Sequence, residues 1–176
     1  MDISEAIKKG VREVPNYPKD GILFKDITTL LSNAELFRRV VDEAAGIVKN
    51  DVDLIAGIEA RGFIIGSALA YKTGKGFIPI RKKGKLPYKK ISEEYSLEYG
   101  TDTIEIHEDA VSNGKRVLIV DDLLATGGTA QAAYNLVKKA GGNPVLFLFL
   151  IELKGLNGRA KLEKYGCNVI SLAEYD

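Results

Sequence analysis

Residues 117–129 combine an apolar stretch, two adjacent acids and a turn of small residues. After Val-Leu-Ile-Val, Asp121 and Asp122 precede a glycine-rich turn at the predicted start of a helix. Such a turn directs backbone N–H groups and the positive end of the helix dipole at a bound anion, which suits a phosphate monoester. Carboxylates at the end of a buried strand can bind sugar hydroxyls or a metal ion. The pattern predicts a phosphorylated sugar as ligand, with its phosphate held by Ala125, Thr126, Gly127, Gly128 and Thr129.

Two commoner phosphate motifs are absent from this stretch. No lysine follows Gly127 and Gly128, as a Walker loop requires, and the dinucleotide pattern Gly-x-Gly-x-x-Gly does not occur. A plain helix-capping turn beside two acids is the alternative from the residues alone. Two successive carboxylates at the end of a buried strand are costly without binding partners, which favours the ligand site.

Two further segments carry side chains suited to such a ligand. Residues 57–63, Gly-Ile-Glu-Ala-Arg-Gly-Phe, place Arg61 beside a glycine, where a planar guanidinium and main-chain amides can bind a pyrophosphate. Residues 17–27 place Phe24 between two turn signals, and an aromatic ring offers a stacking face for a base. A solvated arginine at a helix start and a phenylalanine of the core are the alternatives.

Residues 81–90 contain six basic residues in ten, Arg81 and Lys85 among them. Clusters of this kind usually bind nucleic acid or form a solvated run. The 25 Lys and Arg residues of the chain are balanced by 24 Asp and Glu residues, which leaves a formal net charge of +1. We therefore expect no nucleic acid as a partner, and only a local role for the cluster.

Buried strands and helices alternate along the chain and must position these residues. Near-continuous aliphatic strands are typical of a parallel sheet covered on both faces, and helices between them indicate βαβ units. We therefore expect an α/β fold with a central, mostly parallel twisted sheet flanked by helices. Strands are predicted over residues 53–58, 76–81, 116–120 and 144–153, and helices over residues 62–72 and 128–140.

Two other segments give clear local signals. Ser32, followed three residues later by Glu35, has the pattern of a capping box, which predicts an amphipathic helix from there to about Lys49. Residues 82–111 lack a helical period and alternate in polarity near their end, so we expect a long loop segment that ends in a β-hairpin. Loops of this length inside a compact domain are usually functional lids, and a disordered segment is the alternative.

The composition fits one soluble domain. The chain has 176 residues, of which 45% are hydrophobic. Its single cysteine, Cys167, and single histidine, His107, cannot build a structural zinc site, and we expect both to be structural. The first residues lack a secretory signal, and the longest apolar run, 145–151, is far shorter than the roughly 20 residues of a membrane helix. We expect a cytoplasmic protein without membrane attachment.

Residues 117–129 resemble the phosphoribosyl pyrophosphate motif of the type I phosphoribosyltransferases, and within that family the variant resembles the members that act on adenine. The other three segments agree, so the resemblance covers nearly the whole chain. It implies one phosphoribosyltransferase domain over residues 1–176, with a small N-terminal hood and a β-hairpin lid. Its implied parts are a hood over about 14–30, a pyrophosphate loop at 58–62, a flexible catalytic loop over about 82–100 and the motif at 117–129.

The resemblance also implies roles for individual residues. Glu98 would be the general acid/base at the purine imidazole, with Arg61 and Lys85 as the other catalytic groups. The family more often has Pro at Asp20 and Arg at Lys25, and a peptide of the pyrophosphate loop, here expected at Ala60–Arg61, is often cis. Pyrophosphate would be bound by Ala60, Arg61, Arg81 and Lys85, ribose 5-phosphate by Asp121, Asp122 and the turn at 125–129, and adenine by Leu23, Phe24 and Lys25.

The implied activity is that of a pentosyltransferase of purine salvage. Adenine N9 would attack C1 of phosphoribosyl pyrophosphate, giving AMP and pyrophosphate. Mg²⁺ would be the cofactor, held mainly by substrate and water, with Asp121 or Asp122 as a further ligand, and the chain would form a homodimer. Two alternatives are a ligand-sensing regulator that keeps the pocket without catalysis and an enzyme of the same chemistry for a 6-oxopurine or another base.

Overall fold

A computed structural model describes residues 1–48, 51–96, 100–112 and 114–176 of the chain. Its elements, in chain order, are α1 (Ile3–Gly10), β1 (Arg12–Pro15), β2 (Leu23–Asp26), α2 (Thr28–Ser32), α3 (Ala34–Ile47), β3 (Leu54–Ile58), α4 (Arg61–Thr73), β4 (Gly76–Lys82), β5 (Lys90–Ser96), β6 (Thr101–His107), β7 (Arg116–Leu124), α5 (Gly128–Lys139), β8 (Asn143–Leu153), the 3₁₀ helix η1 (Lys154–Leu156), α6 (Gly158–Glu163) and β9 (Asn168–Tyr175).

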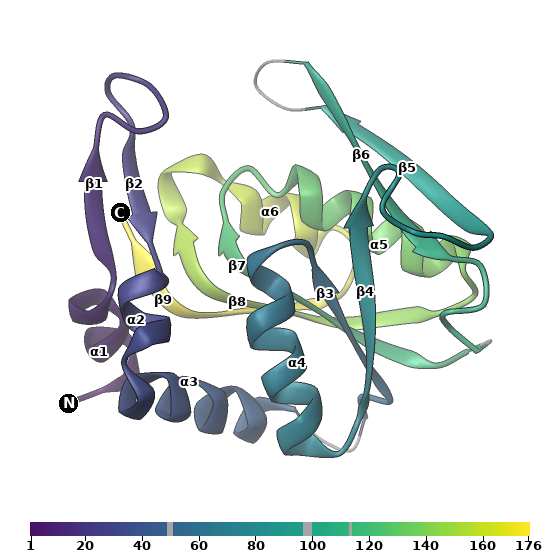
Figure 1. Cartoon of the computed structure of the whole chain (residues 1–176), viewed down its shortest axis with the longest axis horizontal. Helices are drawn as coiled ribbons and strands as arrows, with labels where there is room; N and C mark the ends of the chain where they lie inside the picture. The colour runs from purple at the N-terminus through teal and green to yellow at the C-terminus, as the bar shows by residue number, and fades with distance from the viewer. Residues whose placement is uncertain (49–50, 97–99, 113) are drawn as a thin grey trace.

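The central sheet has the strand order β5-β6-β4-β3-β7-β8-β9. Strands β4, β3, β7, β8 and β9 run parallel, while β6 is antiparallel to β4 and β5 is antiparallel to β6. Helices cover both faces (Figure 1). The predicted α/β fold with a mostly parallel sheet is confirmed, and all four predicted strands are present.

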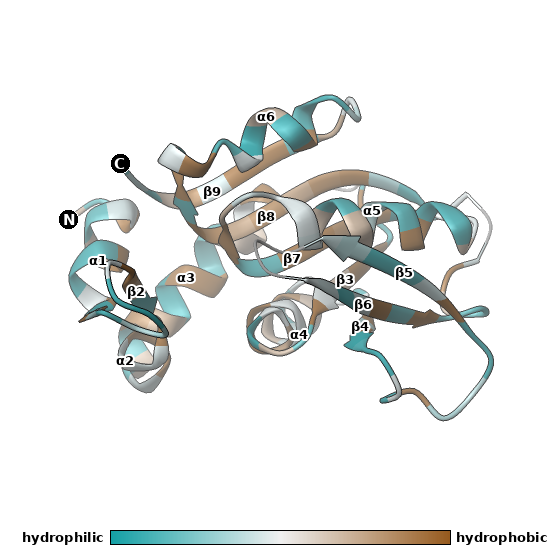
Figure 2. Cartoon of the chain, turned by 90° about the horizontal axis from the view of Figure 1, so that it is seen from above, coloured by the Kyte–Doolittle hydropathy of each residue, from teal (hydrophilic) through white to brown (hydrophobic). Residues whose placement is uncertain are grey.

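Burial on both faces explains why β7 is apolar from Val117 to Val120. Val117 and Ile119 belong to a core with α5 and α6, whereas Leu118 and Val120 belong to a second core with α1, α3 and α4. Figure 2 shows these two layers, with α5 and α6 on one side of the sheet and α4 on the other. Since both faces of the strand are buried, each residue from Val117 to Val120 must be apolar.

Strand β7 extends further than predicted. The sequence predicts its end at Val120, but β7 continues to Leu124 because β8 pairs with it as far as the register Leu124↔Glu152. Asp121 and Asp122 therefore lie within the strand rather than after it.

The predicted capping box at Ser32 is wrong. Ser32 is the last residue of the short helix α2, and its hydroxyl donates to the carbonyl oxygen of Thr29 at 3.0 Å. The cap of α3 is Asn33, whose Oδ1 accepts a hydrogen bond from the Leu36 backbone N–H at 3.1 Å. Asparagine caps helices as well as serine does, and the extra turn of α2 shifts the cap by one residue. The helix ends at Ile47, and Lys49 lies outside the described residues.

The predicted hairpin in residues 82–111 is confirmed. Strands β5 and β6 pair from Lys90↔His107 to Ser96↔Thr101, and β6 is joined to the central sheet through the register Arg81↔Glu105. This β5–β6 hairpin is therefore ordered over its described residues and extends the sheet by two strands. It lies across the sheet from the separate β1–β2 hairpin, and the two flank the loops after β3 and β7 (Figure 1).

Strands β1 and β2 form the second, two-stranded sheet, with Val14 opposite Phe24. Asp26, at the end of β2, accepts hydrogen bonds from the Thr28 backbone N–H and hydroxyl and from the Arg12 guanidinium. These hydrogen bonds lower the pKa of Asp26 to about 2. In the described part of the chain, no helix has both the length and the apolar character of a transmembrane span.

Candidate active site

The predicted phosphate turn, residues 125–129, joins the end of β7 to the start of α5. Gly127 has a left-handed backbone with φ 77°. Among the residues that the structure describes, no side chain caps α5, so the first turn of this helix faces the hollow of the phosphate turn. The hollow has a volume of about 70 Å³. It is lined by Asp121, Leu123, Leu124, Ala125, Thr126, Gly127, Gly128, Thr129 and Ala130, and thus by all five predicted phosphate ligands.

The two acids of β7 form a compact charged group with Arg61. Asp122 is only 5% exposed and accepts a hydrogen bond at Oδ2 from Arg61 Nε at 2.5 Å. Asp121 Oδ1 accepts the backbone N–H of Asp122 at 2.9 Å. Burial and the adjacent charge of Asp122 raise the pKa of Asp121 well above its ordinary value. The structure therefore brings the residues predicted for ribose and for pyrophosphate together.

Arg61 supplies the charge that compensates this acidic pair. Burial alone would lower the pKa of the Arg61 guanidinium, but the charge and hydrogen bond of Asp122 raise it above its ordinary value. A buried carboxylate needs such a partner because water is excluded from around it. The Arg61 side chain is 44% exposed, so it remains accessible to a second anion.

The loop between β3 and α4 brings Arg61 to β7 through a close backbone contact. A Cβ atom at Gly62 would lie 2.6 Å from the Val120 carbonyl oxygen and 3.1 Å from Asp121 Oδ1. Only glycine allows the first turn of α4 to lie this near the acids. The cis peptide of the loop is Glu59–Ala60, one peptide before the position expected from the resemblance. Ala60 caps α4.

Glu59 is a site residue for which the sequence analysis predicted no role. Its Oε2 accepts hydrogen bonds from the Lys82 backbone N–H at 2.8 Å and from Arg81 Nε at 3.2 Å. Burial would raise the pKa of Glu59, but these hydrogen bonds and the Arg81 charge lower it below its ordinary value. Arg81 also donates to the Lys85 carbonyl oxygen at 3.2 Å, so the backbone at Lys85 lies beside the Arg81 guanidinium. An acid directly after β3 was the available signal.

The β1–β2 hairpin directs Phe24 toward Arg61. The Arg61 guanidinium carbon lies 5.8 Å from the centre of the Phe24 ring, and Tyr17 contacts that ring edge to face at 5.2 Å. Phe24 is half-buried rather than part of the buried core, and Leu23 is 45% exposed. An aromatic face beside the predicted pyrophosphate cation is thus available to a ligand.

Lys25 points away from Phe24, as the alternation of a strand requires. It forms an ion pair with Glu13, and its Nζ lies 4.2 Å from the centre of the Tyr175 ring. The Lys25 side chain, at a position where the family more often has Arg, therefore joins the β1–β2 hairpin to the C-terminal strand. Asp20, the other departure, is exposed.

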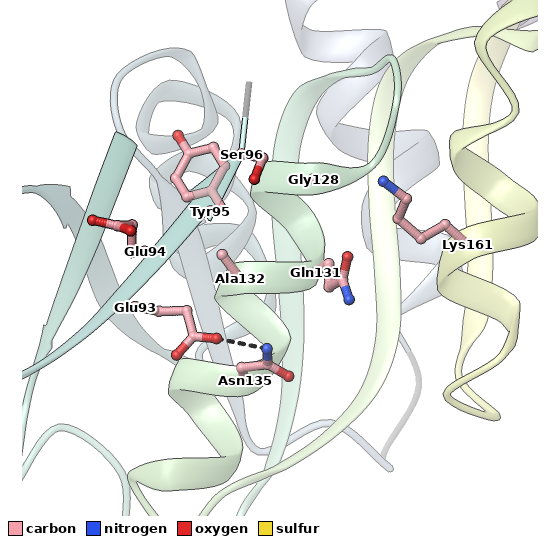
Figure 3. Close-up of a pocket in the computed structure, with 9 residues that line it drawn as sticks. All are labelled: Glu93, Glu94, Tyr95, Ser96, Gly128, Gln131, Ala132, Asn135 and Lys161. Atoms are coloured by element: carbon pink, nitrogen blue, oxygen red, sulfur yellow. Dashed lines mark hydrogen bonds between the residues drawn. The ribbon is translucent and has the colours of Figure 1, made fainter. Parts of the chain in front are cut away.

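A second hollow, of about 260 Å³, lies between β5 and the first turns of α5 (Figure 3). Glu93 accepts hydrogen bonds there from Asn135 at 2.7 Å and from Lys139 at 2.5 Å, which fixes β5 on the helix. A Cβ atom at Gly128 would lie 3.4 Å from the Ser96 carbonyl oxygen, so β5 reaches the phosphate turn. Glu98, the predicted general acid/base, lies outside the described residues.

The donor set at β7 fits a magnesium ion that the substrate helps to hold. No group of three or more His, Cys, Asp or Glu side chains within the described ranges could cage a metal. Two adjacent carboxylates, one of them paired with Arg61, are instead the kind of set that Mg²⁺ uses together with water and phosphate oxygens.

Cys167 and His107 lie in packed surroundings, as expected for structural residues. Cys167 is buried, with its Sγ 3.1 Å from the Pro144 carbonyl oxygen, and burial raises the pKa of its thiol. The His107 ring contacts Tyr88 edge to face at 6.1 Å.

Comparisons with known proteins agree with this geometry. Residues 26–172 match the phosphoribosyl transferase domain family. An adenine phosphoribosyltransferase of Brachyspira hyodysenteriae is 59% identical over 165 residues, which cover 93% of this chain and 97% of that protein.

Solved structures give the same result. The adenine phosphoribosyltransferase of Thermoanaerobacter pseudethanolicus has a TM-score of 0.93 and 52% identity, with 97% of this chain and 99% of that chain covered. The enzyme of Saccharomyces cerevisiae, complexed with adenine and an imino-altritol bisphosphate, has a TM-score of 0.88 and 40% identity. The match covers 97% of this chain and 98% of the yeast chain. The chain therefore belongs to the phosphoribosyl transferase domain family, among its adenine phosphoribosyltransferases.

Proposed function

We propose that the chain transfers the 5-phosphoribosyl group of phosphoribosyl pyrophosphate to N9 of adenine, giving AMP and pyrophosphate in a Mg²⁺-dependent reaction of cytoplasmic purine salvage. The observation that carries the proposal is the meeting of Asp121, Asp122 and Arg61 beside the hollow of the phosphate turn. Hydroxyl-binding acids, a pyrophosphate-binding cation and a phosphate cradle lie at one edge of the sheet.

The sugar is held at two positions in this proposal. Backbone N–H groups and hydroxyls of residues 125–129 bind the 5′-phosphate, and Asp121 and Asp122 accept hydrogen bonds from the ribose hydroxyls. Binding energy from the phosphate, which does not react, then orients the anomeric carbon. The same carboxylates lie near the positive charge that develops on the sugar as the bond to pyrophosphate breaks.

The leaving pyrophosphate is stabilised by cations and by the main chain of residues 58–62. Arg61 exchanges part of its contact with Asp122 for pyrophosphate oxygens, with its open edge turned to the ligand. Arg81, oriented by Glu59, and Lys85 approach from β4, and the Ala60 N–H contributes from the loop. The N9–C1 bond forms as the C1–O bond breaks, so the configuration at C1 is inverted.

Adenine binds under the hood, residues 14–30, in this proposal. Phe24 stacks on the base, and main-chain groups of Leu23 and Lys25 pair with its edge. Main-chain pairing of this kind rejects 6-oxopurines because it would leave buried polar groups unpaired. Glu98, in the catalytic loop of residues 82–100, takes the proton that N9 loses when the lid has excluded water.

Bound Mg²⁺ would neutralise charge on the pyrophosphate oxygens. Asp121 or Asp122 would hold it together with substrate oxygens and water. All parts belong to one domain of residues 1–176, which we propose acts as a homodimer.

A substrate panel tests the proposal. The protein is incubated with phosphoribosyl pyrophosphate, Mg²⁺ and one of adenine, hypoxanthine, guanine or xanthine, and the nucleotide formed is measured. Formation of AMP at a rate far above that of the other nucleotides is expected. A preference for another base would contradict the hood assignment. Binding without turnover of any base would instead indicate a ligand-sensing regulator.

A further inference from the structure

Helix α6 lies directly behind the phosphate turn, although none of its residues belongs to the predicted site. A Cβ atom at Gly158, the first residue of α6, would lie 2.2 Å from the Ala125 carbonyl oxygen and 2.9 Å from the Gly127 backbone nitrogen. Conversely, a Cβ atom at Gly127 would lie 3.0 Å from the Gly158 carbonyl oxygen. The two backbones therefore touch from both sides, and each contact requires glycine.

A buried ion pair fixes the start of α6 on the sheet. Arg159 Nε donates to both carboxylate oxygens of Glu152, at 3.0 and 3.1 Å, and Glu152 is only 3% exposed. Another guanidinium nitrogen of Arg159 donates to the Val169 carbonyl oxygen at 2.6 Å, and Ser171 donates to Glu152 at 2.7 Å. The first turn of α6 is thus held to β8 and β9 by a planar, forked cation.

The position of this pair in the sheet links it to the phosphate turn. Glu152 lies opposite Leu124, the last residue of β7 before the turn. The turn itself consists of small residues, and no side chain in the described part of the chain caps α5. Its rear support is therefore the backbone of α6 at Gly158.

We infer that Gly158 and the Glu152–Arg159 pair are positioning residues that set the geometry of the phosphate turn, and thereby its affinity for the 5′-phosphate of the sugar. This inference rests on the proposed function, because it assumes that residues 125–129 hold a sugar phosphate. None of these three residues lines the hollow of the phosphate turn. They act through the backbone at Ala125 and Gly127.

Gly158→Ala tests the inference, with Gly155→Ala as its matched control. A Cβ atom at Gly155, three residues earlier, would have no neighbour within 4 Å in the described ranges of the chain. The Cβ at position 158 forces the backbones apart by on the order of 1 Å, a displacement that can cost about 10²-fold in activity. We expect kcat/KM for phosphoribosyl pyrophosphate to fall by about this factor, with KM for adenine unchanged at saturating sugar substrate. Gly155→Ala should behave as the wild-type protein.

Calorimetric binding of ribose 5-phosphate separates this inference from the proposed reaction, because it needs no base and no turnover. At least tenfold weaker binding by Gly158→Ala than by Gly155→Ala is expected. Equal binding by the two proteins, including no measurable binding by either, would overturn the inference. A different preferred base in the substrate panel would overturn the proposed reaction and leave this result intact.

Arg159→Lys provides a second variant in case Gly158→Ala does not fold. Lysine keeps the charge beside Glu152 but loses the fork that also reaches Val169. We expect weaker binding of ribose 5-phosphate and an unchanged KM for adenine. Wild-type binding by a folded Arg159→Lys protein would show that the ion pair does not position the turn.

Discussion

Arg61 connects three parts of the proposed site. Its guanidinium pairs with Asp122 and lies beside the ring of Phe24, while its own backbone begins α4 next to the cis peptide Glu59–Ala60. In the proposed mechanism, this side chain neutralises the acidic pair before the substrate binds and faces the leaving group afterwards. The residue contributes to binding in both states, and its removal should affect more than one step.

Arg61→Ala is expected to lower kcat/KM by about 10²- to 10³-fold, the usual effect of losing one charge-stabilising donor. In the reverse reaction, the KM for pyrophosphate should rise, because the cation that binds it is absent. Steady-state kinetics in both directions provide the measurement. Arg61→Lys keeps the charge and loses the forked geometry, so its kinetic constants should lie between those of the wild-type protein and those of Arg61→Ala. An unaltered KM for pyrophosphate in Arg61→Ala would contradict the assignment.

Glu98→Gln should lower kcat by about 10²- to 10⁴-fold, because the amide cannot accept the proton from N9. The KM values for adenine and for the sugar substrate should change little, since the side chain acts on the reacting proton. Presteady-state measurement of AMP formation would isolate the chemical step. Turnover equal to that of the wild-type protein would remove Glu98 from the mechanism.

At the scale of elements, α4 and β7 meet in a close backbone contact at the site. The contact depends on Gly62, because any Cβ there would meet the Val120 carbonyl oxygen. The acids of β7 and the arginine of α4 thus have a separation fixed by backbone contact. Side-chain flexibility contributes little to it.

Gly62→Ala should therefore destabilise the fold by about 1–3 kcal/mol, the usual cost of overpacking. Gly46→Ala is the control, because a Cβ at Gly46 in α3 would meet no described residue within 4 Å. There alanine should stabilise the helix by about 0.5–1 kcal/mol. Urea unfolding of both variants measures the difference. A Gly62→Ala protein as stable as Gly46→Ala would show that α4 can shift away from β7.

Strand β9 contacts the β1–β2 hairpin through Tyr175. Its ring lies under Lys25, on the side of β2 opposite to Phe24. Tyr175→Leu removes a cation–π contact worth about 0.5–2 kcal/mol. We expect the KM for adenine to rise several-fold while the KM for phosphoribosyl pyrophosphate stays unchanged. A proportional rise in both KM values would point to a general loss of folded protein instead, which a thermal unfolding curve would detect.

Much of the element order could be predicted from the sequence, because strands buried on both faces and glycine-flanked helices have strong local patterns. The two wrong element boundaries each have a physical cause. The cap of α3 moved from Ser32 to Asn33 because a short helix precedes it, and β7 extended past Val120 because β8 pairs with it there. Pairing between strands about 30 residues apart is not encoded in either strand alone.

The candidate site could be predicted in its parts but not in its contacts. Residues 125–129 and the acids lie together as expected, since one motif contains them. The pairing of Glu59 with Arg81 depends on the register of β3 and β4, and the support from Gly158 depends on the path of the chain after β8. Such contacts join residues far apart in sequence, where no motif spans both.

For the whole molecule, paired carboxylates should govern the loss of stability in acid. The hydrogen bonds of Thr28 and Arg12 lower the pKa of Asp26 from 3.8 to about 2. Hydrogen bonds from Arg116 likewise lower the pKa of Asp53 far below its ordinary value. A lowered pKa in the folded state means that these carboxylates stabilise the fold above their unfolded pKa, and that this contribution is lost as the pH falls.

We expect the thermal midpoint of the wild-type protein to drop as the pH falls from about 4 to 2, the interval between the unfolded and folded pKa values of Asp26. Asp26→Asn should be less stable at pH 7 and lose less stability over this interval. Asp121, whose raised pKa favours its protonated form in the fold, acts in the opposite direction. Thermal scans at several pH values give the slopes, and equal slopes for the two proteins would contradict the assignment to Asp26.

The single thiol of the chain lies buried beside Pro144, and burial keeps its pKa high. A protonated, shielded thiol reacts slowly with maleimide reagents at neutral pH. A second cysteine introduced on the exposed face of the β5–β6 hairpin, for example by Glu94→Cys, could thus be labelled selectively with a fluorescent dye. The emission of that dye would then report the movement of the hairpin as substrates are added, without prior replacement of the native cysteine.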